Sequence, residues 1–400
     1  MHAPIALFDA LKEAGAGRLS MSMRDGLPRA VASRDDGPWE PVSLVLPAES
    51  SASWEAALDA LAASACESAD WVVDPSTGLQ LLMVRHRRAD GASRGTLRRV
   101  DFAVTESDLL AGAFMLARHA SAGLRLAGAA PAGCHAVVHG PGPVGPLRDA
   151  WARSLGEELA LAGFTVVPES GIDATLGVAL LQAAPRVLGG DGLAVSAAVL
   201  AAHEALRAMD ATLGLVPSES TVLLTGLGAV GLPLARRLVA ENRKVCVSDR
   251  DLRRIDGLID GLSPDVRGNV TTVAPYQASS TPCDVFIPAA PVGSLRFEDV
   301  LALRTRGVVG PCETPILVAG PADDGLWTSA LFERGICAAP AGFATAGVFS
   351  ILSLHAEGKT LTPAGVHART TRLARGVLGT LLDACRRRGA DPSRVIAASD

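Results

Sequence analysis

Lysine is nearly absent from this sequence of 400 residues. Only Lys12, Lys244 and Lys359 occur, although lysine and arginine together number 37, so arginine carries almost all of the positive charge. Aspartate and glutamate number 42, and the formal net charge is −5 at pH 7. Proteins that bind nucleic acid usually carry a concentrated surplus of positive charge. The absence of one argues against a nucleic-acid partner.

Long apolar runs and paired cysteines are missing as well. No run of about 18 residues is free of polar side chains, so no membrane span is predicted. Asp9 interrupts the first apolar stretch and no basic segment precedes it, which does not fit a signal peptide. The seven cysteines are scattered, with no C-x-x-C pair and no histidine at metal-binding spacing. This usage predicts reduced thiols in a cytoplasmic protein and no metal site.

What the sequence does contain is a dinucleotide-binding fingerprint in its second half. Apolar residues 222–224 predict a short buried strand, followed by Gly226-Leu227-Gly228-Ala229-Val230-Gly231, a complete G-x-G-x-x-G. An apolar-periodic helix comes next, then a second strand at 245–247 that leads into Asp249. Asp249 lies 23 residues after Gly226, close to the roughly 20 expected of a nucleotide-binding βαβ unit. These residues are the candidate cofactor site.

The three glycines have separate physical roles. Gly226 makes the tight turn, Gly228 lets a pyrophosphate approach the backbone, and Gly231 lets helix and strand pack closely. The N–H groups of the first helical turn, including Ala229 and Val230, are free to bind phosphate at the positive end of the helix dipole. The fingerprint therefore predicts a Rossmann nucleotide site.

The residues after the second strand bear on the choice of cofactor. The carboxylate of Asp249 can accept hydrogen bonds from the ribose hydroxyls and would repel a 2′-phosphate, which favours NAD. Arg250 follows directly and can pair with that phosphate. We therefore predict NAD, with NADP as the alternative.

Periodicity elsewhere predicts an α/β protein of two domains. Helices are expected at 7–14, 54–65, 105–120, 147–162 and through most of 174–212, with strands at 71–74, 79–88, 96–104, 135–139 and 164–167. Short apolar segments at 270–273, 283–288, 307–310 and 316–320 end in glycine or proline, the rhythm of a parallel sheet. We expect an N-terminal α/β substrate-binding and oligomerisation domain over residues 1–205. A Rossmann domain with a doubly wound parallel sheet follows over 206–350, and a C-terminal helix at 362–390 packs back on the first domain.

Two finer expectations concern the first half. Thr105 should cap the helix that follows, with Asp108 three positions later. Arginine is concentrated between Arg85 and Arg99. These side chains are either solvated positions of strands or an anion-binding patch for an acidic substrate.

Four stretches of the chain resemble one family when they are taken in order. They are GLGAVGLPLARRL with VCVSD, CDVFIPAAPVGSL, VAGPADDGL and ERGICAAPAGFATAGV. The chain thereby resembles the Glu/Leu/Phe/Val dehydrogenases, most of all the leucine and phenylalanine branch, over about residues 70–400. The resemblance implies a substrate domain that also builds an oligomer, a Rossmann domain and a cleft between them. It further implies NAD(P)-linked hydride transfer at an amine or imine carbon, with Ala289 and Ala290 among the cofactor contacts.

The chain departs from the family where the family uses lysine. Two lysines of the family's substrate domain bind the substrate carboxylate and assist the chemistry, but no lysine lies between residues 13 and 243 here. Arg118 stands at the place of the carboxylate-binding lysine, and a guanidinium can bind the same anion. Ser170 stands at the place of an aspartate that shares proton transfer, with Asp173 close by.

The place of the second lysine depends on which element anchors the comparison. Counting forward from the preceding helix gives Ala130, and counting back from the next strand gives His135. We prefer the strand, because loops absorb insertions more readily. An imidazole can exchange a proton near neutral pH. His135 is therefore predicted as proton donor or acceptor, with Ser170 or Asp173 orienting it. The alternative is a histidine that only caps the entrance of a strand.

Three functions remain open at this point. The first is an NAD(P)-dependent oxidoreductase acting on CH–NH2 or C=N groups of a small, anionic substrate with a non-standard active site. The second is a catalytically inactive pseudo-enzyme that binds nucleotide as a regulatory or partner subunit. The third, a scaffold that binds no nucleotide, is disfavoured by the intact fingerprint. Trp39, Trp54 and apolar stripes in the N-terminal 65 residues favour a homo-oligomer, and the alternative is that these residues pack within the chain itself.

Overall fold

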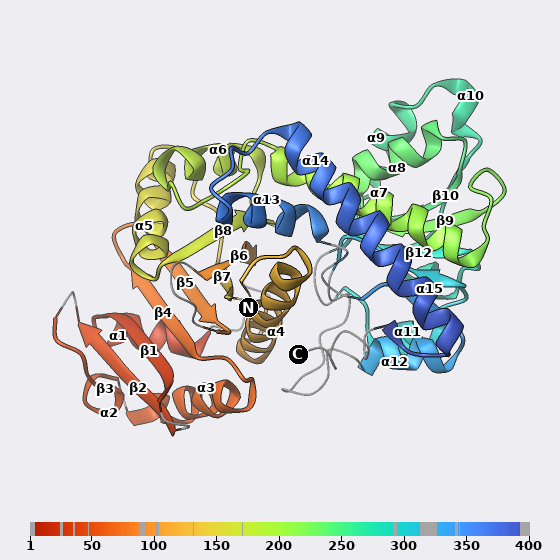
Figure 1. The fold of residues 1–400 in the computed structure, drawn as a ribbon. Coiled ribbons are helices and arrows are strands. Elements are labelled where there is room, and N and C mark those ends of the chain that lie inside the picture. The colour runs from red at the N-terminus through yellow and green to blue at the C-terminus, as the bar shows by residue number, and fades with distance from the viewer. Residues whose placement is uncertain are drawn as a thin grey trace. The chain divides into compact units, whose positions relative to one another are not determined.

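The structure is a computed structural model that divides into two compact units (Figure 1). It describes residues 5–24, 27–34, 37–46, 48–87, 93–100, 104–130, 132–169, 171–290, 294–312, 326–340, 343 and 345–392. The first unit comprises residues 1–194, 318–322 and 351–359, and the second comprises 195–317, 323–350 and 360–400. The α/β class expected from the sequence is confirmed in both.

The first unit is built on a mixed sheet of eight strands. These are β1 (Ala16–Arg24), β2 (Leu27–Arg34), β3 (Glu40–Pro41), β4 (Ser68–Asp74), β5 (Leu79–Arg85), β6 (Ser93–Val100), β7 (Gly133–His139) and β8 (Phe164–Pro168). Their order is β3-β2-β1-β4-β5-β7-β6-β8. Strand β6 runs parallel to β7 and β8, and the other neighbours pair antiparallel. The parallel part of the sheet thus lies around β6.

Helices cover both faces of this sheet. They are α1 (Ala6–Glu13), α2 (Val42–Val45), α3 (Ser51–Ala63), α4 (Glu106–Leu126), α5 (Leu147–Leu161) and α6 (Ala174–Ala183), with a short 3-10 turn, η1, at Ala48–Ser50. Residues of α1, α3 and α4 share one buried cluster with Trp71, Leu82 and Val137. Residues of α5 and α6 share another with Leu81, Ala136 and Val138. Odd-numbered residues of β7 therefore face α4 and even-numbered ones face α5, as strand alternation requires.

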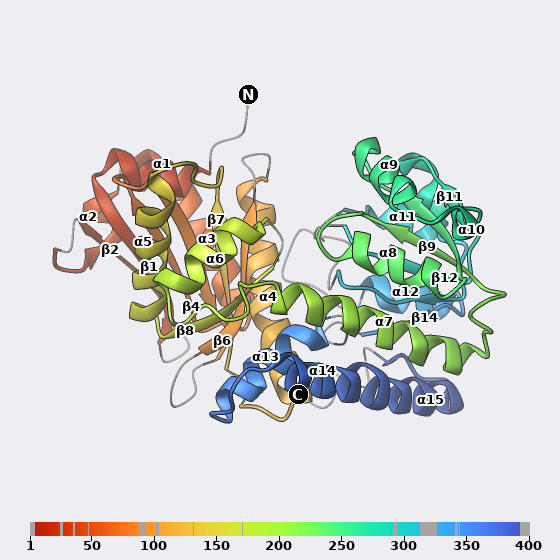
Figure 2. The ribbon, with the colours of Figure 1, turned by 90° about the horizontal axis from the view of Figure 1, so that it is seen from above.

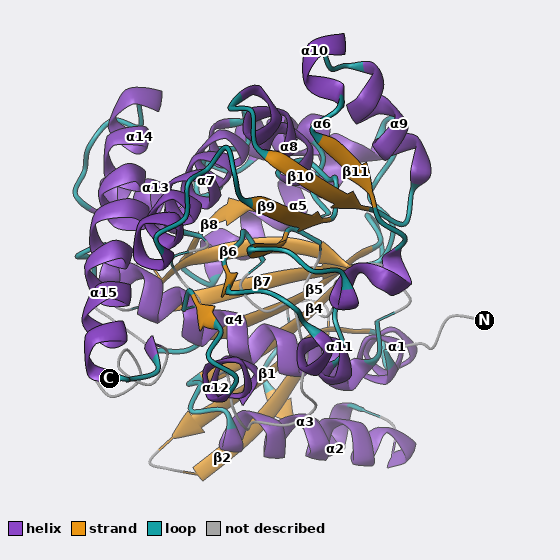
Figure 3. Cartoon of the chain, turned by 90° about the vertical axis from the view of Figure 1, so that its right-hand side faces the viewer, coloured by secondary structure: helices purple, strands orange, loops and turns teal. Residues whose placement is uncertain are grey.

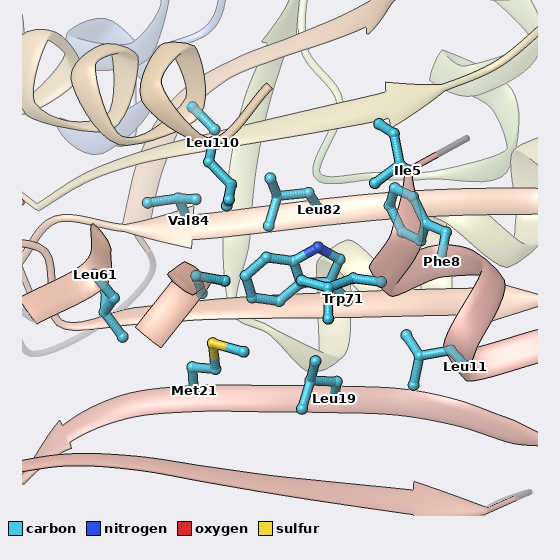
Figure 4. Packing of buried hydrophobic residues seen from close by; sticks show 14 of the residues in the cluster. Ile5, Phe8, Leu11, Leu19, Met21, Leu61, Trp71, Leu82, Val84 and Leu110 are labelled. Carbon is cyan, nitrogen blue, oxygen red and sulfur yellow. The ribbon is translucent and has the colours of Figure 1, made fainter. Parts of the chain in front are cut away.

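The cluster on the α4 face is centred on Trp71. Its indole is fully buried on β4, and Figure 4 shows it beside Leu19 and Met21 of β1 and Leu82 of β5. The sequence analysis assigned no strands to residues 16–34, which form the β1–β2 hairpin. The alternation of Leu19, Met21 and Met23 with polar residues has the two-residue period of a half-buried strand, and it was overlooked.

Most of the other elements of the first unit were predicted. The hairpin of β4 and β5 and its turn at 75–78 are confirmed. Thr105 caps α4, since its hydroxyl accepts the N–H of Asp108 at 3.2 Å. Helix α4 runs six residues beyond the predicted end at Ala120, because its C-terminal half is still buried against β7.

The second unit holds a sheet of six strands that all run parallel. They are β9 (Thr221–Thr225), β10 (Lys244–Ser248), β11 (Val270–Thr272), β12 (Val285–Pro288), β13 (Gly307–Val308) and β14 (Cys337–Ala338). Their order is β11-β10-β9-β12-β13-β14, the order of a Rossmann domain, in which the strand order reverses between β9 and β12. Figure 3 shows β9, β10 and β11 side by side. The parallel sheet predicted from the sequence is confirmed.

The helices of this unit are α7 (Leu193–Leu213), α8 (Gly231–Ala240), α9 (Leu252–Asp260), α10 (Pro264–Arg267), α11 (Phe297–Ala302) and α12 (Leu326–Glu333), with a 3-10 turn, η2, at Pro275–Ser280. Helix α13 (Ala346–Ala356) is divided between the units, because the second unit includes residues up to 350 and the first includes 351–359. The strand expected at 316–320 lies outside the described residues. Strand β14 was not expected, because two residues carry too short a pattern to predict.

The C-terminal helix belongs to the second unit and not to the first. It consists of α14 (Pro363–Thr371), a π-helical segment, η3 (Arg372–Val377), and α15 (Leu378–Arg388). It runs beside α7 (Figure 2), where Thr212 donates to Asp383 at 3.2 Å and Arg386 donates to the carbonyl of Thr212. We expected residues 362–390 to pack back on the first domain, and this division instead assigns them to the second unit. The expected domain boundary at 205 likewise differs from the division at 194. Most of α7 belongs to the second unit, because this helix packs along α15.

Within the described residues, no helix is both long and apolar enough to span a membrane.

Candidate nucleotide and substrate sites

The fingerprint loop lies at the carboxyl end of β9, the central strand of the parallel sheet. Gly226 has φ +93°, a left-handed conformation that favours glycine. A Cβ at this position would lie 2.6 Å from the backbone nitrogen of Ala290. The neighbouring Ala289 donates its N–H to the carbonyl of Thr225 at 2.8 Å. The structure therefore brings Ala289 and Ala290 against the fingerprint, as expected for cofactor contacts.

The other two glycines have contrasting surroundings. A Cβ on Gly231 would lie 1.9 Å from the carbonyl oxygen of Gly226, so the start of α8 can approach the loop only without a side chain. A Cβ on Gly228 would meet nothing within 4 Å. The protein thus leaves open the space that a pyrophosphate would occupy beside Gly228. Ala229 and Val230 complete the loop that leads into α8.

Asp249 follows β10 and is turned toward the fingerprint. Its Oδ2 accepts the N–H of Leu227 at 2.6 Å, and its Oδ1 accepts the N–H of Asp251 at 2.8 Å. Nη1 of Arg254 lies 3.7 Å from the same Oδ2, and the Asp249 side chain is only 7% exposed. The acid therefore fixes the loop through its hydrogen bond to the N–H of Leu227. Arg250, the next residue, is exposed.

His135 lies in the interior of the first unit. It is 0% exposed on β7, with Val84 of β5 and Thr96 of β6 as its partners in register. Nδ1 of the ring is 2.6 Å from the hydroxyl of Thr96, and Nε2 has no hydrogen-bond partner among the described residues. Burial, with a smaller effect from the positive charge of Arg98, holds the pKa of His135 well below its ordinary value. The ring is thus neutral at physiological pH.

Asp173, one of the two predicted orienting partners, does not contact this ring. Asp173 is exposed, and its carboxylate caps α6 by accepting the N–H of Leu176 at 2.8 Å. Ser170 lies outside the described residues. The observed partner, Thr96, was missed by the sequence analysis. Alternation along β6 places Thr96 and Arg98 on one face, but only the register of β6 against β7 places Thr96 beside His135.

The arginines of β5 and β6 use their donors inside the unit. Nε of Arg98 donates to Glu169 at 2.6 Å, and both side chains are nearly buried. Arg85 donates to Ser93 at 3.1 Å and lies over the ring of Phe164. Neither a solvated strand face nor an open anion-binding patch describes these two residues, which link β6 to the end of β8 and β5 to the start of β6.

Arg99 and Arg118 are two further basic residues of the first unit. Arg99 donates to the carbonyls of Gly171 at 2.7 Å and Gly140 at 3.2 Å, so it also has a structural role. Arg118 lies half-buried on α4, one residue after Ala117, which packs against the sheet. No group of three or more histidine, cysteine, aspartate or glutamate side chains suited to a metal ion occurs within the part of the chain that is described.

Comparison with known proteins agrees with this arrangement. No family model matches the chain. Over 257 residues the chain is 25% identical to a phenylalanine dehydrogenase of Caldalkalibacillus thermarum (strain TA2.A1), and the alignment covers 61% of this chain and 68% of that protein.

Solved structures with the same fold are also dehydrogenases. An L-tryptophan dehydrogenase from Nostoc punctiforme matches with a TM-score of 0.60 at 19% identity, covering 85% of this chain and 97% of that one. A hetero-hexameric glutamate dehydrogenase from Thermus thermophilus, in its Leu-bound form, matches with a TM-score of 0.60 at 19% identity, covering 86% and 94%. The sequence relative and the shared fold both support the resemblance to the Glu/Leu/Phe/Val dehydrogenase-like family.

Proposed function

We propose that this chain is an NAD(P)-dependent oxidoreductase that transfers a hydride at an amine or imine carbon of a small, anionic substrate. The observation that carries the proposal is the fingerprint loop, with open space at Gly228 and an acid at Asp249. The relatives are named as dehydrogenases of phenylalanine, tryptophan and glutamate, which supports amino acids or their imines as the substrate class. A bound nicotinamide supplies the hydride chemistry, and the protein binds and orients the reactants.

The test is a titration with NADH and NADPH followed by a substrate screen at 340 nm. Binding of a dinucleotide together with turnover of an amino acid or oxo acid would support the proposal. Absence of binding would reject it. NAD is the proposed preference, because Asp249 stands where the free ribose hydroxyls would donate.

A second candidate is a nucleotide-binding pseudo-enzyme. One observation favours it: His135, which stands in place of the family's second lysine, has no exposed surface. A general acid or base must come within hydrogen-bonding reach of the proton that it moves. Tight dinucleotide binding without turnover of any amino or oxo acid would support this candidate over the enzyme.

Arg118 is the proposed contact for an anionic group of the substrate. Its guanidinium presents a planar fork to a carboxylate and stays charged at any working pH. Its place on α4 corresponds to the family's carboxylate-binding lysine. His135 stays the predicted proton donor or acceptor, with Thr96 as the observed partner of its Nδ1, although its burial weighs against a direct role.

Kinetic measurements distinguish the proposed roles of Arg118 and His135 once a substrate is found. Arg118→Ala should raise KM for an acidic substrate and leave dinucleotide affinity unchanged. If His135 moves a proton, His135→Asn should lower kcat by ~10²–10⁴ with the cofactor affinity intact. Unchanged turnover in His135→Asn would remove it from the mechanism, and an unchanged KM in Arg118→Ala would do the same for Arg118.

The chain is further proposed to be a cytoplasmic homo-oligomer that assembles through its N-terminal half. All seven cysteines are free, which suits a reducing compartment. Trp39 is 51% exposed and Leu27 is 63% exposed, while Trp54 packs partly against the core of its own unit. Light scattering at micromolar concentration should give a mass of at least twice 41.0 kDa. A monomer would contradict the proposal.

A further inference from the structure

Two long helices of the second unit lie side by side in a regular register (Figure 2). They are α7 and the C-terminal helix formed by α14, η3 and α15. Three contacts join them: Ser196 with His367, Glu204 with Arg375, and Thr212 with Asp383. The partners are 171 positions apart at the first and last contacts. The helices therefore run parallel and present one continuous surface.

The carboxylates of these two helices are withdrawn from that surface or already bound. They are Glu204, Asp210 and Asp383. The side chain of Glu204 is 9% exposed and lies 3.7 Å from Arg375, and Asp210 is 4% exposed. Asp383 is exposed, but it accepts the hydroxyl of Thr212. Little negative charge is thus left for a partner.

The arginines of the same helices are exposed. Five of them, which we call the arginine face, are Arg207 on α7 and Arg372, Arg375, Arg386 and Arg387 on the C-terminal helix. Arg375 is 53% exposed although it approaches Glu204. Arg207, Arg372 and Arg387 have no hydrogen bond or ion pair among the described residues. Their guanidinium groups keep their donors for water or for a partner.

The contacts between the helices place these arginines along one seam. Arg375 and Arg386 both reach α7, at Glu204 and at the carbonyl of Thr212. Arg372 is three residues before Arg375, and Arg387 is four residues after Asp383, so helical spacing brings both to the same side. Arg207 is three residues after Glu204 on α7 and adjoins the seam in the same way.

Small side chains separate the arginines of this seam. Ala211 and Gly376 are exposed, and a Cβ on Gly376 would meet nothing within 4 Å. The large apolar side chains that the two helices expose are Val195, at 37%, and Val377, at 38%. A lipid surface is bound by helices that insert several large apolar side chains. The seam instead suits a polar partner that approaches closely.

The helix geometry changes within the arginine face. Arg372 and Arg375 belong to η3, where the helix adopts π-helical hydrogen bonding between two α-helical segments. Such segments are rare and are frequently found at functional sites. This observation is independent of the charge, and it falls on the same residues.

We propose that the arginine face docks an acidic segment of another protein, whose carboxylates pair with the guanidinium groups. A guanidinium presents a planar fork to a carboxylate and forms short, charge-assisted hydrogen bonds with it. The chain as a whole carries a net charge of −5, so this face attracts a partner that the rest of the chain repels. The inference goes beyond the proposed function and does not depend on it.

The experiment measures binding of a fluorescent glutamate-rich peptide to the full chain by anisotropy. The variant Arg207→Gln/Arg372→Gln/Arg387→Gln removes three arginines that have no partner in the described structure, so its fold should be kept. Thermal unfolding checks this for the variant. If the melting temperature falls, Arg207→Gln and Arg387→Gln are measured singly.

A second triple variant is the control for net charge. Arg87→Gln/Arg153→Gln/Arg304→Gln removes three exposed arginines that lie outside the two helices. It changes the net charge by the same amount as the first variant. A difference between the two variants therefore reports on the arginine face and not on the charge of the whole chain.

The wild-type chain should bind the peptide, and affinity should fall by about tenfold between about 0.05 M and about 0.15 M salt, because exposed charges are screened. The variant of the arginine face should bind about tenfold or more weakly, and the control should stay within about threefold of the wild type. NADH affinity should be the same in all three chains.

Four results would overturn the inference. The wild-type chain could fail to bind the peptide, or the control could weaken binding as much as the variant does. Tighter binding of a DNA duplex or of anionic lipid vesicles would mean another class of occupant. A smaller mass of the variant in light scattering would assign the face to contact between copies of this chain. None of these results bears on NADH binding, so the proposed function is tested separately.

Discussion

Arg243→Met should lower the free energy of unfolding by about 3–5 kcal/mol, because it leaves the carboxylate of Asp210 buried without its partner. Arg243 is 1% exposed at the start of β10, and Asp210 is 4% exposed on α7. Nη1 of Arg243 donates to Oδ1 of Asp210 at 3.2 Å, and Nη2 donates to Oδ2. The pair thereby fixes α7 to the parallel sheet of its own unit.

Urea denaturation followed by circular dichroism measures this loss. Burial raises the pKa of Asp210, and Arg243 opposes that rise. Without the arginine, the pKa of Asp210 is higher in the folded state than in the unfolded state, so Asp210 lowers the free energy of unfolding at pH values above its unfolded-state pKa. The loss of stability in Arg243→Met should therefore become smaller as pH falls toward about 4. The double variant Asp210→Leu/Arg243→Met should recover most of the stability, since apolar replacement of a buried ion pair is often neutral.

A surface pair supplies the control for this experiment. Nζ of Lys359 lies 2.7 Å from Glu357, and Lys359 is 59% exposed. Lys359→Met should leave the denaturation midpoint nearly unchanged, because exposed ion pairs contribute little. A loss below about 1 kcal/mol in Arg243→Met would mean that Asp210 is neutral or solvated, which contradicts the role given to the pair.

Gly228→Val should weaken dinucleotide binding about 10- to 100-fold without changing the stability of the protein. The added side chain meets no protein atom within 4 Å of its Cβ, but it fills the space proposed for the pyrophosphate. A steric conflict of this size costs ~1–3 kcal/mol, which sets the range. Isothermal titration with NADH and a thermal melt of the unliganded protein measure the two effects.

Gly231→Ala should damage both properties. Its Cβ would lie 1.9 Å from the carbonyl oxygen of Gly226, so α8 and the loop must move apart and the melting temperature should fall together with affinity. Gly257→Ala on α9 is the control, because its Cβ meets nothing within 4 Å and helical alanine is favoured by ~0.5–1 kcal/mol. If Gly228→Val bound NADH normally, the dinucleotide would not occupy this loop.

The sequence predicted those parts of the fold that depend on short stretches of chain. The βαβ unit from Gly226 to Asp249 could be recognised because turn, helix and acid follow one another at fixed spacing, and each requirement is local. The hairpin of β4 and β5 could be recognised because a turn separates two apolar strands. The parallel direction of the strands in the second sheet could be predicted because the short apolar segments are separated by lengths of chain that suit helices.

The environment of the candidate substrate residues could not be predicted in this way. His135 was assigned correctly to a strand, but its burial depends on β5, β6 and α4, which pack around β7 only in the folded unit. Its hydrogen bond to Thr96 joins residues 39 positions apart, and the pair of Arg98 and Glu169 joins residues 71 apart. The sequence around each of these residues does not indicate which distant residue it will bind.

The same distinction applies to the arginines. Composition alone determined that arginine carries almost all of the positive charge, so that every cationic side chain of the first unit except Lys12 and Lys359 is a planar donor of fixed charge. Only the tertiary structure decided that Arg85, Arg98 and Arg99 donate hydrogen bonds to neighbouring strands and loops. It also decided that Arg250 stays exposed. The physical reason is that burial removes water from a guanidinium, so its donors must be satisfied by whichever groups the fold brings within reach.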